Sequence, residues 1–261
     1  MELIENLNDW RGKYARWHGD LKDYNYVFNK RSPFTPARRA LPLINLALIS
    51  SAGAFIDGTE AFDVQARGGD FTFREIPIEV GGADLQFAAR GYDPASVQQD
   101  LNSQIPIERL LDYQNNAVIG QLNPVWWSFM GYIPDAANFV ETAVPKMVER
   151  IKRYEVQAAL IIPASRLCHQ SCGLLARGVE AAGIPTMMLA VERTVADSVH
   201  APRVGFYNGE FGSVSGKPNF KQHQLRILDE ALRWYESLDQ PTVRKLVVEL
   251  ESDVEEMRGE K

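Results

Sequence analysis

The stretch VQAALIIPASRLCHQSCGLLARGVEAAGIPTMMLAV, residues 156–191, decides the fold. Its first part, Val156 to Pro163, has no polar alternation beyond its second residue, which predicts a strand buried on both faces. Cys168 to Ala182 has a helical pattern that ends at Gly183, and Thr186 to Val191 is a second apolar run. A strand, a helix and a strand in this order predict a parallel, right-handed β-α-β unit.

Similar patterns on either side extend this unit. Further strands are predicted at Leu43 to Ser50, Phe71 to Ile76, Ala83 to Ala88 and Val204 to Tyr207. Further helices are predicted at Asp100 to Asn115, Pro134 to Tyr154, Lys221 to Leu238 and Thr242 to Met257, and Pro145 should kink or split the second of these. Near the N-terminus, Trp10, Tyr14, Trp17 and Leu21 recur at helical spacing, which predicts an amphipathic helix within residues 1–30.

Together these elements predict an α/β fold with a mainly parallel, doubly wound sheet built from Rossmann- or flavodoxin-like units. Helices close the chain within residues 221–258. We expect a single α/β domain over residues 1–261, with two lobes at about 33–135 and 136–235 as the alternative division.

Composition narrows the class of function. Hydrophobic residues make up 45% of the chain and charged residues 24%, as in an ordinary globular protein. The net charge of −6 argues against a nucleic-acid partner, and no apolar run reaches the roughly 18 residues of a membrane span. Met1 to Lys13 is polar and does not resemble a signal peptide. With only two cysteines, four residues apart, a reducing cytoplasmic compartment is expected.

The candidate site follows the strand that ends at Pro163. In open parallel sheets ligands bind beyond the carboxyl ends of the strands, and a group of polar residues falls there: Ser165, Cys168, His169, Gln170, Ser171 and Cys172. A thiol at a helix N-terminus meets the positive end of the helix dipole, which favours the thiolate. We therefore predict Cys168 as a nucleophile, His169 as its proton donor or electrostatic helper, and Cys172 as a further catalytic candidate. Ser165, Gln170 and Ser171 are predicted as substrate contacts.

Simpler interpretations of these residues stay open. A lone cysteine is often a small buried hydrophobe, and Ser165 could be no more than the helix N-cap. Cys172 lies one helical turn from Cys168, which is a poor geometry for a disulfide in a regular helix, so it could belong to the core. Four close ligands for a metal are not apparent, and no metal site is predicted.

Other polar residues could line the same edge of the sheet. Ser50, Ser51 and Gly53 follow the first predicted strand, where small residues let backbone N–H groups approach a carboxylate, or else form a tight turn. Arg109 could hold a substrate carboxylate or pair on the surface. The dense aromatic cluster of residues 126–132 could be core, a subunit contact or a wall of the site.

The segment PASRLCHQSCGLLARGVEAAGIPTMML, residues 163–189, resembles the selenoprotein B family of glycine, sarcosine, betaine and D-proline reductases. Four other stretches are similar to that family in the same order: PFTPARRALPLINLALISSAGAFIDGTEAFD, GYDPASVQQDLNSQIPIERLL, AVIGQLNPVWWSFMGYI and RVGFYNGEFGSVSGKPNFKQHQLRIL. They cover roughly residues 33 to 235. The ordered set is more specific than any single stretch.

The resemblance implies a thiol or selenol that cleaves a carbon–heteroatom bond reductively, with a pyruvoyl group on a partner subunit activating the substrate amine. Cys168 matches one residue of the family's redox motif, and Ser165 stands at the other position of the pair. No pair of cysteines with a two-residue spacer is therefore present. Cys172 could replace the missing partner only if the first helical turn unwinds, and an external dithiol or thioredoxin-type reductant is the other possible electron donor.

Three hypotheses follow. The first is a reductase-like enzyme that cleaves a C–N or C–S bond of a small polar substrate, working with a second reductase subunit and as a homo-oligomer. The second keeps a covalent Cys168 adduct but no redox cycle, as in a lyase or desulfurase. The third is a non-catalytic subunit or ligand-binding protein of the same fold.

Overall fold

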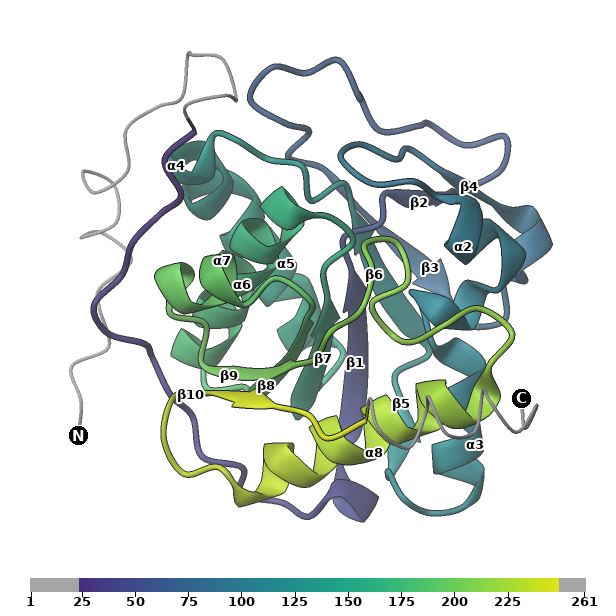
Figure 1. Ribbon diagram of the computed structural model, residues 1–261, viewed down its shortest axis with the longest axis vertical. Coiled ribbons are helices and arrows are strands. Elements are labelled where there is room, and N and C mark those ends of the chain that lie inside the picture. The colour runs from purple at the N-terminus through teal and green to yellow at the C-terminus, as the bar shows by residue number, and fades with distance from the viewer. Residues whose placement is uncertain (1–23, 249–261) are drawn as a thin grey trace.

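The computed structural model describes residues 24–248 (Figure 1). Its eight-stranded sheet has the spatial order β10 (Thr242–Lys245), β9 (Arg203–Phe206), β8 (Thr186–Ala190), β7 (Ala158–Ile162), β1 (Asn45–Ser50), β6 (Val125–Phe129) and β3 (Phe73–Pro77), and β5 (Gln121–Leu122) also pairs with β1. All pairs are parallel except β3 with β6. The predicted mainly parallel α/β fold is confirmed, and strands from both halves of the chain share this one sheet. A separate antiparallel pair joins β2 (Ala54–Ile56) to β4 (Leu85–Phe87).

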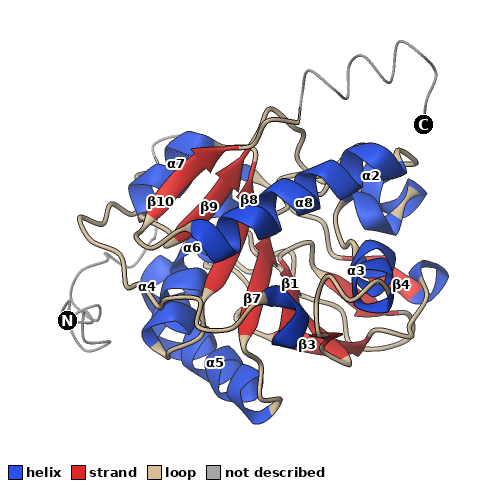
Figure 2. Ribbon diagram, turned by 90° about the horizontal axis from the view of Figure 1, so that it is seen from below, coloured by secondary structure: helices blue, strands red, loops and turns tan. Residues whose placement is uncertain are grey.

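Helices cover both faces of the sheet (Figure 2). One face packs against α5 (Val144–Arg153), α6 (Arg166–Ala181) and α7 (Arg193–Val199), and the other packs against α3 (Ile107–Asn115) and α8 (Lys221–Ser237). The central strands contribute side chains to the core on each face of the sheet. On β7, Leu160 belongs to the core beneath α3 and α8, and Ile161 belongs to the core beneath α5 to α7. This two-sided burial explains why β7 and β8 have apolar runs without polar alternation.

The predicted unit of strand, helix and strand is confirmed. β7 leads into α6, and α6 into β8, which pairs in parallel with β7 through Leu160 and Met187. The predicted helix over residues 134–154 is split, as Pro145 suggested. A short α4 (Ala136–Asn138) passes into a π-helical turn over Phe139–Ala143, and α5 then begins with Pro145 in its first turn, where its missing N–H is tolerated.

The prediction of a helix from Thr242 is wrong. Thr242–Lys245 is the edge strand β10, which pairs in parallel with β9 through contacts such as Val243 with Val204. The neighbouring helix, α8, is confirmed with nearly its predicted bounds. The sequence prediction also missed β6, α7 and the short helix α2 (Ala95–Gln99).

The N-terminal helix was predicted on Trp10, Tyr14, Trp17 and Leu21, which lie outside the described residues. Residues 24–36 form no helix. They run as an extended segment, here called the strap, along α6 (Figure 1). Within residues 24–248, no helix is both long and apolar enough to cross a bilayer.

Candidate functional site

The N-terminus of α6 holds the predicted nucleophile. Ser165 is the N-cap, and its hydroxyl oxygen accepts the Cys168 backbone N–H at 3.2 Å. The same hydroxyl donates to Cys168 Sγ at 2.9 Å. Ser165 is therefore the predicted N-cap and also the closest polar group to the thiol.

Cys168 is deeply buried. Its side chain is 1% exposed, and Sγ faces the Ser51 carbonyl oxygen at 3.8 Å. Burial raises the pKa of the Cys168 thiol, and the hydrogen bond from Ser165 acts in the opposite direction. In this structure the Cys168 thiol is therefore protonated at neutral pH, and is not the exposed thiolate that the helix terminus alone would favour.

Gly131, which the sequence analysis missed, packs directly against the Cys168 thiol. Gly131 follows β6, and a Cβ there would lie 2.5 Å from Ser51 Cβ and 3.0 Å from both Cys168 Sγ and Ser171 Oγ. The Gly131 N–H donates to the Ser51 carbonyl, and its own carbonyl accepts the Ser171 hydroxyl at 2.6 Å. Three segments far apart in the sequence therefore meet around Cys168 because one of them carries no side chain.

His169 connects two strand ends through both ring nitrogens. Nε2 lies 3.1 Å from the Val191 N–H and 3.2 Å from the Glu192 N–H, which both donate to it. Nδ1 must then carry the proton and donate to the Ser165 carbonyl, 2.7 Å away. Burial lowers the pKa of His169 to about 4, so the ring is neutral. Neither nitrogen is left to donate a proton to Cys168.

Gln170 attaches the strap to the site. Its Oε1 accepts the Val27 N–H at 2.8 Å, and its Nε2 donates to the Tyr24 hydroxyl at 2.6 Å. A cavity of about 170 Å³ lies at this point, lined by Tyr24, Tyr26, Gly91, Tyr132, Ser165, Arg166 and Leu167. The strap tyrosines therefore form part of the wall in front of Ser165, with Cys168 behind it.

The second cysteine belongs to the core. Cys172 is fully buried and packs with the residues under α5 to α7, whereas Cys168 belongs to the cluster on the other face. Both thiols are free. Burial raises the pKa of Cys172 well above its usual range, and α6 is a regular α-helix at both positions.

The structure separates the remaining predicted residues. Ser51 is part of the site, where its hydroxyl accepts the Ala164 N–H at 3.0 Å. Ser50 is buried within β1, and its hydroxyl faces the Ala52 N–H at 3.4 Å. Gly53 has a φ of +68°, and a Cβ there would lie 2.8 Å from the Ala88 carbonyl oxygen. Gly53 therefore brings the turn after β1 close to the backbone just after β4, where its carbonyl accepts the Ala88 N–H.

Arg109 lies in a different polar cluster. Its Nε donates to Gln224 Oε1 at 2.9 Å, and the Gln224 amide donates to Asp100 at 2.6 Å. These bonds join α3 to α8 and hold Arg109 away from a substrate role next to Cys168. The predicted aromatic cluster is largely core: Trp126, Trp127, Phe129 and Met130 are buried.

Two further residues that the sequence analysis missed surround the thiol. Gly91 has a φ of +81°, and a Cβ there would lie 3.3 Å from Ser165 Oγ and 2.6 Å from the Tyr132 ring. Tyr92 donates from its hydroxyl to the Ala52 carbonyl at 2.6 Å. Both lie within the stretch GYDPASVQQDLNSQIPIERLL, so the resemblance was the one signal that could have directed attention to them. Across the described chain, no group of three or more histidine, cysteine or acidic side chains is placed to hold a metal.

Comparison with known proteins points to one group of complexes. The chain is 28% identical over 214 residues to the D-proline reductase subunit gamma of Acetoanaerobium sticklandii, which covers 82% of this chain and 86% of the relative. The chain is a homologue of amino-acid reductase subunits. It is also 23% identical over 177 residues to the glycine reductase complex component B subunit gamma of Symbiobacterium thermophilum, and 24% identical over 180 residues to the sarcosine reductase complex component B subunit beta of Peptoclostridium acidaminophilum.

These matches confirm the predicted resemblance. The glycine and sarcosine reductase matches cover 67% of this chain but only 41% and 40% of those subunits, so the chain corresponds to less than half of those two relatives. No family model matched the chain, and no solved structure matched it.

Proposed function

We propose that the chain is the thiol-bearing subunit of a reductase complex that cleaves a C–N or C–S bond of a small polar substrate. The observation that carries this proposal is the position of the Cys168 thiol. It lies at the capped N-terminus of α6 and hydrogen bonds to Ser165, a residue that lines the 170 Å³ cavity at the carboxyl edge of the sheet. Relatives named as D-proline, glycine and sarcosine reductase subunits support the reaction class.

The proposed chemistry uses one protein thiol. Cys168 loses its proton and attacks the substrate carbon that carries the leaving group; an S–C bond forms while the C–N bond breaks, and the amine leaves with a proton. An external thiol then attacks Cys168 Sγ, so that the substrate carbon departs with the bonding electron pair and takes a proton from water. A second external thiol reduces the resulting mixed disulfide and regenerates Cys168.

The external thiols are needed because the polar neighbour of Cys168 is the hydroxyl of Ser165, which cannot form a disulfide. Cys172 packs into the core on the other face of the sheet and is not positioned as a substitute. We propose that a partner subunit supplies a pyruvoyl group, whose chemistry makes the substrate amine a better leaving group. This chain would contribute the thiol, the N-cap hydroxyl and the wall that excludes water.

The decisive experiment is an assay of C–N cleavage by the chain together with its second subunit, with and without a dithiol. It follows amine release from glycine, sarcosine and betaine, and the ring-opened 5-aminopentanoate from D-proline. Cys168→Ser should abolish release, and Cys172→Ser, the matched control, should retain it. Full activity of the Cys168→Ser variant would contradict the proposal. Activity that needs no dithiol would instead favour the lyase or desulfurase hypothesis.

A second candidate, a non-catalytic subunit, is favoured by the 1% exposure of Cys168 and by the raised pKa of its thiol. The two candidates differ in what happens when the strap is released. A catalytic Cys168 should become reactive once Tyr24 and Tyr26 leave the cavity wall. A structural cysteine should stay unreactive, because the core itself would protect it.

A further inference from the structure

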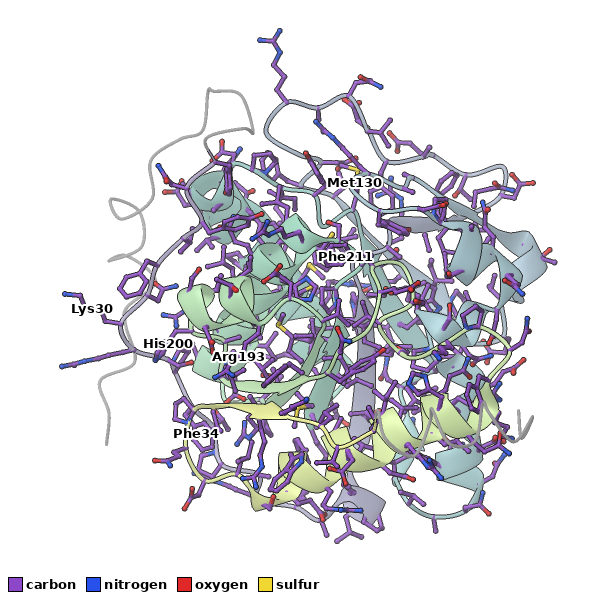
Figure 3. The ribbon with its side chains drawn as sticks, viewed as in Figure 1. Lys30, Phe34, Met130, Arg193, His200 and Phe211 are labelled. Atoms are coloured by element: carbon purple, nitrogen blue, oxygen red, sulfur yellow. The ribbon has the colours of Figure 1, made fainter. Side chains whose placement is uncertain are left out.

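A second cavity lies at the opposite edge of the sheet from Cys168. Its volume is about 720 Å³, and it opens where β7 and β8 begin. Its walls come from strap residues 32–36, from Arg38 and Arg39 just after the strap, from Gln157 and Pro185 just before the two strands, and from Tyr235 of α8. Since β7 has five residues, roughly 16 Å of strand separates the two edges. Figure 3 shows Phe34, which lines this cavity, far from Phe211, whose ring contacts His169.

The polar groups in this cavity include several unused hydrogen-bond donors. Tyr235 is 2% exposed, yet its hydroxyl makes no hydrogen bond within residues 24–248. Gln157 uses its Oε1 to accept the Asn45 N–H, and its Nε2 has no partner in the same part of the chain. Arg38 and Arg39 stand at the rim and form no ion pair with any described residue. No aspartate or glutamate lines the cavity.

The walls are also held in place before any ligand arrives. The Arg203 guanidinium lies 3.9 Å from the centre of the Phe34 ring and is fixed by a buried ion pair with Glu180 at 2.5 Å. Thr35 is tied to the same glutamate through its backbone N–H and to the Glu180 carbonyl through its hydroxyl. Because Glu180 is fully buried and occupied by these donors, its charge does not compensate the two rim arginines.

From these observations we infer that the amino-edge cavity is a second ligand site, which binds an anion that carries a ring. The charged end, a phosphate or a carboxylate, pairs with Arg38 and Arg39, whose guanidinium groups match either anion bidentately. The ring packs against Phe34, and a polar substituent on the ring accepts a hydrogen bond from the Tyr235 hydroxyl. A cavity of this volume is in the range that holds a small molecule or cofactor. The site is independent of the proposed reductase chemistry.

The test is calorimetric titration of the full chain with ADP, phenylpropionate, adenosine and inorganic phosphate at low ionic strength. We expect ADP or phenylpropionate to bind with a Kd below about 1 mM, and adenosine and phosphate, which lack the charge or the ring, to bind at least about tenfold more weakly. Binding of ADP alone identifies a phosphate ligand, and binding of phenylpropionate alone a carboxylate ligand. If neither reaches that affinity, the inference is wrong.

Substitutions test whether the probe binds in the amino-edge cavity. The double variant Arg38→Ala/Arg39→Ala should weaken the binding probe about tenfold or more, because it removes both charged donors. Tyr235→Phe should weaken ADP binding a few-fold, because the adenine offers acceptors for the Tyr235 hydroxyl, and should not affect phenylpropionate, whose ring has none. The fold should stay intact, since this hydroxyl has no partner in the described chain. The double variant Arg193→Ala/Lys221→Ala removes the same charge elsewhere and should bind like the natural chain. Equal loss in both double variants would show nonspecific attraction and overturn the inference.

Discussion

The two ends of α6 hold the same strap by different chemistry. At the N-terminal end the contacts are neutral: Gln170 binds Val27 and Tyr24, and the uncharged ring of His169 fixes the neighbouring turn. At the C-terminal end they depend on charge, because the buried pair of Glu180 and Arg203 holds Thr35. The neutral end adjoins the thiol, and the charged end adjoins the amino-edge cavity. The comparison teaches that the turn fixed by His169 at one end of the helix and the strap anchor at the other end respond oppositely to pH.

The largest expected effect comes from breaking the charged end. Arg203→Ala leaves Glu180 buried and without its counterion, which should lower the free energy of unfolding by about 3–5 kcal/mol at pH 8. Urea denaturation measures this loss. The double variant Glu180→Leu/Arg203→Met removes both charges and should lose much less. If the double variant is as unstable as Arg203→Ala, packing rather than charge explains the effect.

The next prediction concerns pH. Burial lowers the folded pKa of His169 to about 4, from about 6.5 in the unfolded chain, so the folded state binds fewer protons there. Neutral His169 therefore contributes about 3 kcal/mol to the free energy of unfolding above pH 6.5, and this contribution is lost as pH falls from 6.5 to 4. Burial raises the pKa of Glu180 to about 7, so the folded state binds more protons there than the unfolded chain. Its contribution to the free energy of unfolding is therefore present below pH 4 and is lost as pH rises towards 7.

These opposite slopes can be separated with single variants. Urea unfolding between pH 4 and 8 should show that His169→Gln removes the loss on acidification, and that Glu180→Gln removes the loss on alkalinisation. The two difference curves against the natural chain should therefore have opposite signs. Curves of the same sign would show that the two ends of α6 do not differ in the way described.

A smaller effect is expected beneath the thiol. Gly131→Ala places a methyl group 2.5 Å from Ser51 Cβ and 3.0 Å from Cys168 Sγ, and should cost about 1–3 kcal/mol of folding free energy. The matched control is Gly81→Ala, where φ is −70° and the nearest neighbour of an added Cβ, Asp84 Oδ2, lies 3.7 Å away. If both variants lose the same stability, the close approach at Gly131 is unimportant. Thermal denaturation compares them.

The smallest stability change should have a clear chemical readout. Gln170→Ala removes both contacts to the strap and should cost about 1 kcal/mol, while alkylation of Cys168 on a Cys172→Ala background becomes faster. Thr35→Val loosens the other end of the strap and should leave that rate unchanged. Mass spectrometry of the alkylated chain follows both. An unchanged rate in Gln170→Ala would support the non-catalytic subunit.

The sequence predicts the centre of this fold better than its edges. The runs in β7 and β8 are apolar on both faces because both faces are buried, so their pattern is unambiguous. β10 is different: Arg244 and Lys245 are exposed at the sheet edge, and their charges continue into a stretch with helical spacing. Nothing local distinguishes such an edge strand from a helix. β6 was missed because its tryptophans suggested a cluster rather than a strand.

The position of the site could be predicted from the sequence, but the contacts and burial of its residues could not. Cys168 and Ser165 were placed correctly at the helix start, because strand, turn and cap are local features. The partners of His169 come from the backbone after β8, and Gly131, which packs against the thiol, follows β6. These contacts depend on which strands become neighbours. The burial that raises the pKa of Cys168 is for the same reason invisible in its own segment.

The position of β1 has a consequence for synthesis of the chain. β1 leaves the ribosome well before its neighbour β7, which begins more than a hundred residues later, as the pairing of Leu46 with Ala158 shows. At translation rates of about 5–20 residues per second, the apolar segment LINLALIS waits roughly 5–20 s for that partner. During this interval it is an exposed hydrophobic segment to which a chaperone can bind. The central pair of the sheet therefore forms only after β7 has been translated.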